Sequence, residues 1–403
     1  MKKSGSKRKK RKRGKRRGAL KILTLLGTFF LLGAAVLFFL NFHSGKPRKP
    51  RPAAYEETHS KPPAHVLQVS KIDHALRTCL SRNKIPKDQV RFLAVRPKQE
   101  KGVEWEFTEL LVHVSGRVSK ELDNDISKTL ASLKPEVTHR GERISENEKT
   151  YHIFAKGFYT HRVRLASIEQ QSASGNQVKE EKKEKARIAI LIDDIGHDVE
   201  LAKSFTQLAF PITLSILPLA PHTQTIVEMA KKAGCDYMLH LPMEPKEYPE
   251  SDPGPGTLLV TMTDEEIREV LKAHMRQVPG AIGVNNHMGS EFTENEGKMS
   301  AVLRELKKRD LFYVDSRTTS LTVAHKLATT LGVPAASRTV FLDNDPSPRA
   351  IEFQIKRLIA AAQETGVAIG IGHPHKATLN VIRTYFEGNK QEARIVPVSK
   401  IVG

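Results

Sequence analysis

From residue 188 to the end of the chain, short apolar runs alternate with stretches in which apolar residues recur at helical spacing. The short runs predict strands at residues 188–192, 212–217, 237–241, 281–285, 311–315, 339–343, 367–372 and 394–398. The helical spacing predicts helices near residues 198–209, 222–233, 264–277, 297–309, 322–331 and 348–363. Regular alternation of strands and helices is typical of a parallel sheet flanked by helices. Eight strands in about 215 residues fit a (β/α) barrel slightly better than an open sheet.

The first predicted strand ends in two adjacent carboxylates. The stretch RIAILIDDIGH begins at Arg187 and places Asp193 and Asp194 directly after five apolar residues. Such a strand is buried on both faces, and parallel-sheet folds bind ligands at the carboxyl ends of their strands. Adjacent carboxylates repel each other, so a bound cation or a shared proton is the usual reason for such a pair. For this stretch alone, an exposed turn with two acids is the alternative.

Polar residues also follow four later strands. They are His240 after the third strand, Asn286 and His287 after the fourth, Asp315 after the fifth, and His373 and His375 after the seventh. Since the carboxyl ends of parallel strands meet at one rim, we expect these side chains to lie close together. Asp and His suit zinc or a similar divalent ion, and three protein ligands leave one position for water. The set therefore predicts metal-assisted hydrolysis, with a free carboxylate as base and a histidine as acid.

An apolar segment near the start of the chain predicts a membrane anchor. Residues 22–40 carry no charge over a length that can cross a bilayer. Thirteen Lys or Arg precede the segment and four follow it closely, which places the N-terminus in the cytoplasm. We therefore predict a basic cytoplasmic tail at 1–21, a single helix in the inner (cytoplasmic) membrane at 22–41, and an extracytoplasmic linker at 42–64. A cleaved signal peptide is the alternative, although no A-x-A-like site follows the segment.

Most of the net charge of +20 lies in the first 52 residues. The first 52 residues contain 17 Lys or Arg and no acid, so the rest of the chain has a net charge of only +3. A nucleic-acid-binding domain would need a basic face with interleaved aromatic residues. The charge distribution therefore predicts that the folded part has no nucleic-acid partner.

A smaller α/β domain is predicted between the anchor and the alternating region, at residues 65–168. Its pattern predicts helices at 69–82 and 119–133 and strands at 104–115 and within 150–165. Its histidines are scattered singly, and the sequence does not indicate what this domain does. A charged linker at 169–186 separates it from the predicted catalytic domain at 187–403. Cys79 and Cys235 lie in different domains, which argues against a disulfide.

Seven short motifs occur in order along the last domain. They are LIDDIG, LHLPMEP, PGPG, GVNNHMGS, DSRT, FLDNDP and IGIGHPH. Over about residues 187–402 they resemble the divergent polysaccharide deacetylase family. That family is related to the carbohydrate esterases that remove N-acetyl groups from chitin-like polymers and peptidoglycan. The resemblance implies a distorted (β/α) barrel that binds a divalent metal, with zinc as the expected ion.

The resemblance also implies roles for individual residues. Asp193 is expected to be the general base, Asp194 the first metal ligand and His373 the catalytic acid. The related deacetylases take two histidine ligands from an H-x-x-x-H-P-like pair on one loop, and this chain has no such pair. We therefore predict His240 and His287, from two different strands, as the remaining ligands.

Further polar residues are predicted around these five. Asn286, Asp315 and His375 are predicted to orient ligands or to bind substrate. Asp343 and Asp345 also follow a strand, and for them a role in the site and a role in a simple turn are equally open.

Three functions are compatible with these patterns. The complete set of polar residues favours the first, the metal-dependent removal of N- or O-acetyl groups from an envelope or extracellular polysaccharide by a membrane-anchored hydrolase. The second is the same chemistry on a non-glycan amide or ester. The third is an inactive envelope module that binds carbohydrate or metal.

Overall fold

The computed structural model describes residues 64–100, 103–168, 185–388 and 392–403. The predicted tail, the predicted membrane helix and almost all of both linkers lie outside these described residues. Among the described residues, no helix is long and apolar enough to cross a membrane. All of the described residues belong to one unit, which spans residues 55–403.

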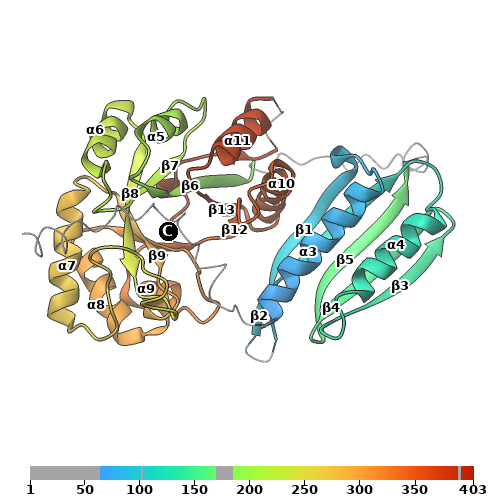
Figure 1. Ribbon diagram of the computed structural model, residues 1–403, viewed down its shortest axis with the longest axis horizontal. Coiled ribbons are helices and arrows are strands. Elements are labelled where there is room, and N and C mark those ends of the chain that lie inside the picture. Colours follow the sequence, from blue (N-terminus) through green and yellow to red (C-terminus); the bar gives the residue numbers. More distant parts are fainter. Residues whose placement is uncertain (1–63, 101–102, 169–184, 389–391) are drawn as a thin grey trace, which may run out of the picture. The chain divides into compact units, whose positions relative to one another are not determined.

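The parallel sheet predicted for the last domain is present, and it curls without closing (Figure 1). Its strands are β6 (Arg187–Ile195), β7 (Thr213–Ile216), β8 (Asp236–Met243), β9 (Gly283–Met288), β10 (Phe312–Asp315), β11 (Ala335–Ser337), β12 (Val340–Phe341), β13 (Val367–Gly372) and β14 (Arg394–Ile395). The order is β11-β10-β9-β8-β7-β6-β13-β12, all parallel, and β14 pairs with β6. The α/β class is therefore confirmed, whereas the described strands form a half-barrel that ends at β11 and β12.

Helices cover the outer face of this sheet (Figure 1). They are α5 (Val199–Thr206), α6 (Thr223–Ala233), α7 (Asp264–Gln277), α8 (Glu296–Lys307), α9 (Ala324–Leu331), α10 (Pro348–Thr365) and α11 (Lys376–Gly388). Ile190 of β6 belongs to the outer core with Leu358 of α10, while its neighbour Leu191 belongs to a separate inner cluster with Ile371 of β13. Burial on both faces explains why the first strand reads as an unbroken apolar run.

Two local signals in the sequence set helix starts. Thr263 Oγ1 accepts a hydrogen bond from Glu266 N, and the Glu266 carboxylate accepts one from Thr263 N, which forms a capping box at the start of α7. Pro348 occupies the first turn of α10, where its missing N–H leaves no intrahelical bond unmade.

The smaller domain is a five-stranded sheet with two helices on one face (Figure 1). Its elements are α3 (Ala64–Arg82), β1 (Val90–Glu100), β2 (Val103–Val114), α4 (Lys120–Ala131), β3 (Val137–Ser145), β4 (Glu148–Ala155) and β5 (Phe158–Ser167). The order is β1-β2-β5-β4-β3, with only β2 and β5 parallel. Leu76 of α3 and Ile126 of α4 pack on Leu110 and Val163 of the sheet in a core of their own.

The predicted elements differ from the structure at several places. Strands β1, β3 and β11 and helix α11 were not predicted. In β3, every residue after Val137 is partly or fully exposed, so the strand carries no apolar alternation. The predicted strand at 339–343 is correct only at residues 340–341, and the predicted strand at 394–398 stops at Ile395.

Candidate active site

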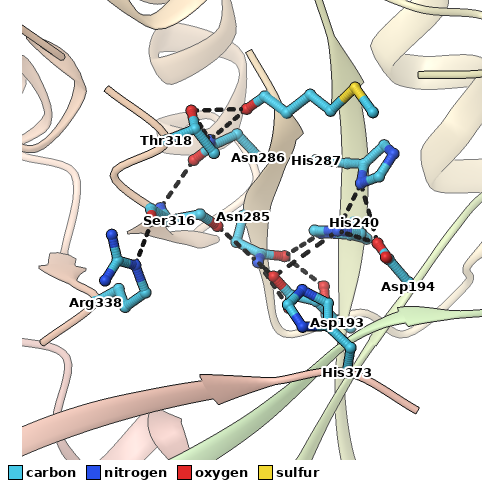
Figure 2. Close-up of polar contacts among 12 residues, drawn as sticks. Asp193, Asp194, His240, Asn285, Asn286, His287, Ser316, Thr318, Arg338 and His373 are labelled. Carbon is cyan, nitrogen blue, oxygen red and sulfur yellow. Dashed lines mark hydrogen bonds and ion pairs between the residues drawn. The ribbon is translucent and has the colours of Figure 1, made fainter. Parts of the chain in front are cut away.

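Asp194, His240 and His287 meet at the carboxyl ends of β6, β8 and β9 (Figure 2). Asp194 Oδ1 lies 3.1 Å from His240 Nε2 and 3.0 Å from His287 Nδ1. The two imidazole nitrogens are 3.2 Å apart. Ligands about 2.0–2.1 Å from a tetrahedral ion lie roughly 3.3 Å from one another. The three donor atoms are therefore spaced to share one divalent cation, and their chemistry suits zinc.

A backbone irregularity brings two adjacent carboxylates to the same place. In a regular strand, Asp193 and Asp194 would point to opposite faces. Here the pairing of β6 with β7 shifts register between Ile192 and Ile195, and Asp194 has a left-handed φ of 53°. As a result His240 Nε2 lies 3.8 Å from Asp193 Oδ2 as well as 3.1 Å from Asp194 Oδ1. A non-glycine residue in this conformation is strained, which is typical of functional sites.

Asn285 connects the predicted base to a predicted ligand (Figure 2). Its Nδ2 donates to both carboxylate oxygens of Asp193 at 3.0 Å. Its Oδ1 accepts from His240 Nδ1 at 3.0 Å and from the Ser215 hydroxyl. When His240 loses one proton to bind a metal, the proton that remains is on Nδ1, because the amide oxygen of Asn285 can only accept. The lone pair of His240 Nε2 is then directed at the Asp194 side, as a metal ligand requires.

His373 is held by a carboxylate that follows β12. Asp343 Oδ1 lies 2.8 Å from His373 Nδ1, and Asp343 Oδ2 accepts from His373 N at 2.7 Å and from Thr378 Oγ1 at 2.6 Å. Burial by itself would lower the pKa of His373, but the adjacent Asp343 carboxylate outweighs it and raises the pKa to about 9. The Phe341 ring stacks on the imidazole, with centroids 5.9 Å apart. His373 is thus a buried and oriented imidazolium.

The environments of the two adjacent carboxylates push their pKa values apart. Burial raises the pKa of Asp193, and the charges of His240 and His373 offset this only in part. Burial also acts on Asp194, but the charge of His287 and the hydrogen bonds to both ligand histidines hold its pKa well below the ordinary value. Two carboxylates separated in this way can take different roles, one as a proton acceptor and one as a permanent anion.

These groups open into one cleft. It is lined by Asp193, Asp194, His240, Asn286, His287, Met288, Ser316, Thr318, Phe341, Asn344 and His373. The structure therefore brings together all five residues predicted as base, acid and ligands.

Of the three residues predicted around these five, Asn286 lines the cleft, whereas Asp315 and His375 do not. Asn286 lines the cleft, but its Oδ1 accepts from Tyr313 Oη and Ser316 N and its Nδ2 donates to Met288 O, so it fixes loops. Asp315 is buried outside the cleft lining, where it accepts from Arg317 N and Thr322 Oγ1.

His375 also lies outside the cleft lining. Its backbone N donates to His373 O at 2.7 Å. The His375 ring lies beside that of His373, with centroids 6.4 Å apart. The predicted roles of His375 and Asp315 in orienting ligands or binding substrate stay predictions. Asn285 also belongs to the site and is not among the predicted residues, although it directly precedes the predicted Asn286 and His287 in the sequence. Asp343, left open between turn and site, belongs to the site.

Residues 190–402 match the family model described as divergent polysaccharide deacetylase. The chain belongs to the divergent polysaccharide deacetylase family, which confirms the resemblance seen in the motifs. It is 32% identical over 216 residues to uncharacterized protein YibQ of Escherichia coli (strain K12), covering 54% of this chain and 67% of that protein. It is 30% identical over 216 residues to an uncharacterized protein of Haemophilus influenzae, covering 54% of this chain and 76% of that protein.

A solved structure shares the fold of the same region. It is the crystal structure of an uncharacterized protein from Agrobacterium tumefaciens C58, with a TM-score of 0.51 and 24% identity. The likeness covers 55% of this chain and 91% of that one. The sequence and structure matches therefore each cover little more than half of this chain.

Proposed function

We propose that this protein is a membrane-anchored, metal-dependent hydrolase that removes N- or O-acetyl groups from an envelope or extracellular polysaccharide. The observation that carries the proposal is the separation of roles in one cleft. Asp194 contacts both His240 and His287, and the adjacent Asp193 is not one of these three predicted ligands. His373 is oriented and kept protonated by Asp343, as an acid requires. Family membership supports a carbohydrate acetyl group as the target.

Asp194, His240 and His287 would hold the cation. The spacing of their donor atoms and the protonation of His240 on Nδ1 fit a divalent ion, with zinc expected from two imidazoles and one carboxylate. When bound, the ion would polarise the acyl carbonyl and make water more acidic.

Asp193 and His373 supply the proton transfers. Asp193 accepts the proton of the attacking water, and Asn285 holds its carboxylate through both oxygens. His373 donates its proton to the departing sugar nitrogen or oxygen, and Asp343 stabilises the imidazolium until that step. Both residues line the same cleft, so a single bound substrate can meet both.

Acetate release tests the proposal. We expect zinc- or cobalt-supplied protein to release acetate from N-acetylated chitin-like or peptidoglycan-derived oligomers, or from O-acetylated glycans. Asp193→Asn should keep the metal and lower the rate by about 10²–10⁴-fold. His325→Ala, which alters an exposed histidine on α9, is the matched control and should retain activity. Cleavage of other amides or esters alone would indicate the second function, and metal binding without any cleavage the third.

The predicted anchor places this chemistry outside the cytoplasm. Protease added to intact cells, with any outer membrane permeabilised, should digest the deacetylase-like domain and leave a short membrane-bound fragment that contains residues 22–41. Full protection of that domain would contradict the proposed topology, whatever the enzyme activity.

A further inference from the structure

The loop between β12 and α10 carries two residues of the site. Asp343 orients His373, and Asn344 lines the cleft. The loop is fixed at one end by Leu342 N, which donates to Ile371 O at 2.7 Å. At its other end, Asp345 Oδ1 accepts from Ser347 N at 3.0 Å, just before α10 begins. The placement of Asp343 therefore depends on what holds the middle of this loop.

The middle of this loop is held by a residue of the smaller domain. Arg77 on α3 donates from its guanidinium to Asp345 Oδ2 at 2.5 Å. The side chain of Arg77 is only 18% exposed, against 40% for Asp345. The same guanidinium nitrogen lies 3.0 Å from His74 Nδ1. An arginine this covered has little freedom to leave its partner, so the pair is a stronger restraint than an ordinary surface ion pair.

Helix α3 is itself fixed against α10. One turn before Arg77, Asp73 accepts from Arg357 of α10 at 2.5 Å, and both side chains are less than a tenth exposed. Residues four apart lie on the same helix face. From this one face, Asp73 contacts α10 and Arg77 contacts the loop that precedes α10. Phe92 of β1 packs edge-on against Phe353 of α10, with centroids 4.8 Å apart. Arg77 is therefore presented to Asp345 by a rigid support.

We propose that Arg77 is a positioning residue for the acid side of the site, acting through Asp345 on Asp343 and so on His373. This inference rests on the proposed function, and it means that the smaller domain helps to position the catalytic acid. A contact that served only to join the two domains could lie anywhere along α10. The Arg96–Glu364 ion pair, 2.7 Å long, does so at the far end of the helix. It provides a natural comparison, because it joins the same two domains, from β1 to α10, away from the loop.

The test compares Arg77→Ala with Arg96→Ala in the full-length protein. We expect Arg77→Ala to lower kcat for acetate release about tenfold with KM little changed, as is typical when an outer partner of a site is lost. Arg96→Ala should keep the wild-type kcat, and Arg77→Lys, which retains one charged donor, should restore most of it. An equal loss in the two alanine variants, or no rescue by lysine, overturns the inference.

A second readout does not need activity. In metal-free protein, the pKa of His373 can be followed by imidazole NMR, with the signal assigned by its absence in His373→Gln. It should fall from about 9 in Arg77→Ala and stay unchanged in Arg96→Ala. If Arg77→Ala does not fold, Asp345→Asn carries the same expectation. An unchanged pKa of His373 overturns the inference, whereas a wild type that releases no acetate overturns only the proposed function.

Discussion

Asp343 Oδ1 lies 2.8 Å from His373 Nδ1, and the 18-residue helix α10 separates the two residues in the chain. The other oxygen of Asp343 accepts from the His373 backbone and from the Thr378 hydroxyl. A carboxylate fixed through both oxygens sets the orientation of the imidazole and favours its charged form. The acid function of the site therefore depends on two residues, with His373 as the proton donor and Asp343 as the residue that orients it and keeps it charged.

Asp343→Asn tests this pair by removing the charge while keeping the size of the side chain. Burial lowers the pKa of His373 and the carboxylate raises it, so its loss must move the pKa downward from about 9. Less of the imidazole is then protonated at any given pH, and the alkaline limb of the kcat profile should shift to lower pH. The exposed loop residue Glu250 provides a control, since Glu250→Gln should leave the profile in place. A profile of Asp343→Asn that overlays the wild type would contradict the pairing.

Much of the site could be predicted from the sequence because its residues follow apolar strands directly. Asp193, His240 and His287 are marked in this way, and the parallel topology brings strand ends together. Asp343 is harder to find, since its strand is only two residues long and its partner is thirty positions away. Asn285 carries no distinguishing signal, because its importance lies in which of its two amide atoms faces which neighbour.

Removing a ligand should remove the metal without unfolding the domain. Asp194→Ala and His287→Ala each delete one of three donors, and rim residues contribute little to core packing. Elemental analysis of purified protein should find one equivalent of divalent ion in the wild type and little in either variant. Circular dichroism should show that both variants stay folded. His325→Ala, at an exposed histidine of α9, is the control and should keep its metal. A full equivalent in both ligand variants would mean that the ion binds elsewhere.

Asn285→Ala should weaken metal binding although Asn285 is not a ligand. Without its Oδ1, the Nδ1 proton of His240 loses its acceptor and the ring is free to turn or change tautomer. Loss of such an outer partner typically raises the dissociation constant about 10–100-fold. Competition with a chromophoric chelator measures the constant directly. Ser215→Ala removes only a donor to Asn285 and should have a smaller effect. Equal affinities of wild type and Asn285→Ala would show that other contacts fix His240.

The fold could be predicted where apolar residues mark an element, either as an unbroken run, as in β6, or as one apolar face of a helix. Helix α7 combines such a face with the Thr263 capping box, and its predicted and observed bounds are the same. Strand β3 could not be predicted in this way, because almost all of its side chains face solvent and it has no apolar face. The opening between β11 and β12 could not be predicted either, since closure depends on strand tilt and register rather than on strand number. The contact of α3 with α10 leaves no periodic signal in the sequence.

Arg357→Ala should strongly destabilise the folded chain. Arg357 donates to Asp73 at 2.5 Å and to Glu106 at 2.6 Å, and its own side chain is 8% exposed. Removing the cation leaves the Asp73 carboxylate buried, with the His161 ring at 3.1 Å as its remaining partner among the described residues. Breaking one partner of a buried pair typically costs about 3–5 kcal/mol of unfolding free energy. Urea denaturation should therefore show a much lower midpoint for Arg357→Ala.

Two further variants separate lost charge pairing from lost packing. Adding Asp73→Asn to Arg357→Ala replaces the carboxylate that has lost its cation with a neutral amide. Because the remaining buried group is no longer charged, the urea midpoint should rise part of the way back to the wild-type value. Lys272→Ala breaks an exposed pair with Glu269 on α7 and should leave the midpoint unchanged. If Arg357→Ala unfolds at the wild-type midpoint, Asp73 must be solvated or protonated in the folded protein. If the double variant is no more stable than Arg357→Ala, the loss comes from the packing of the arginine side chain rather than from its charge.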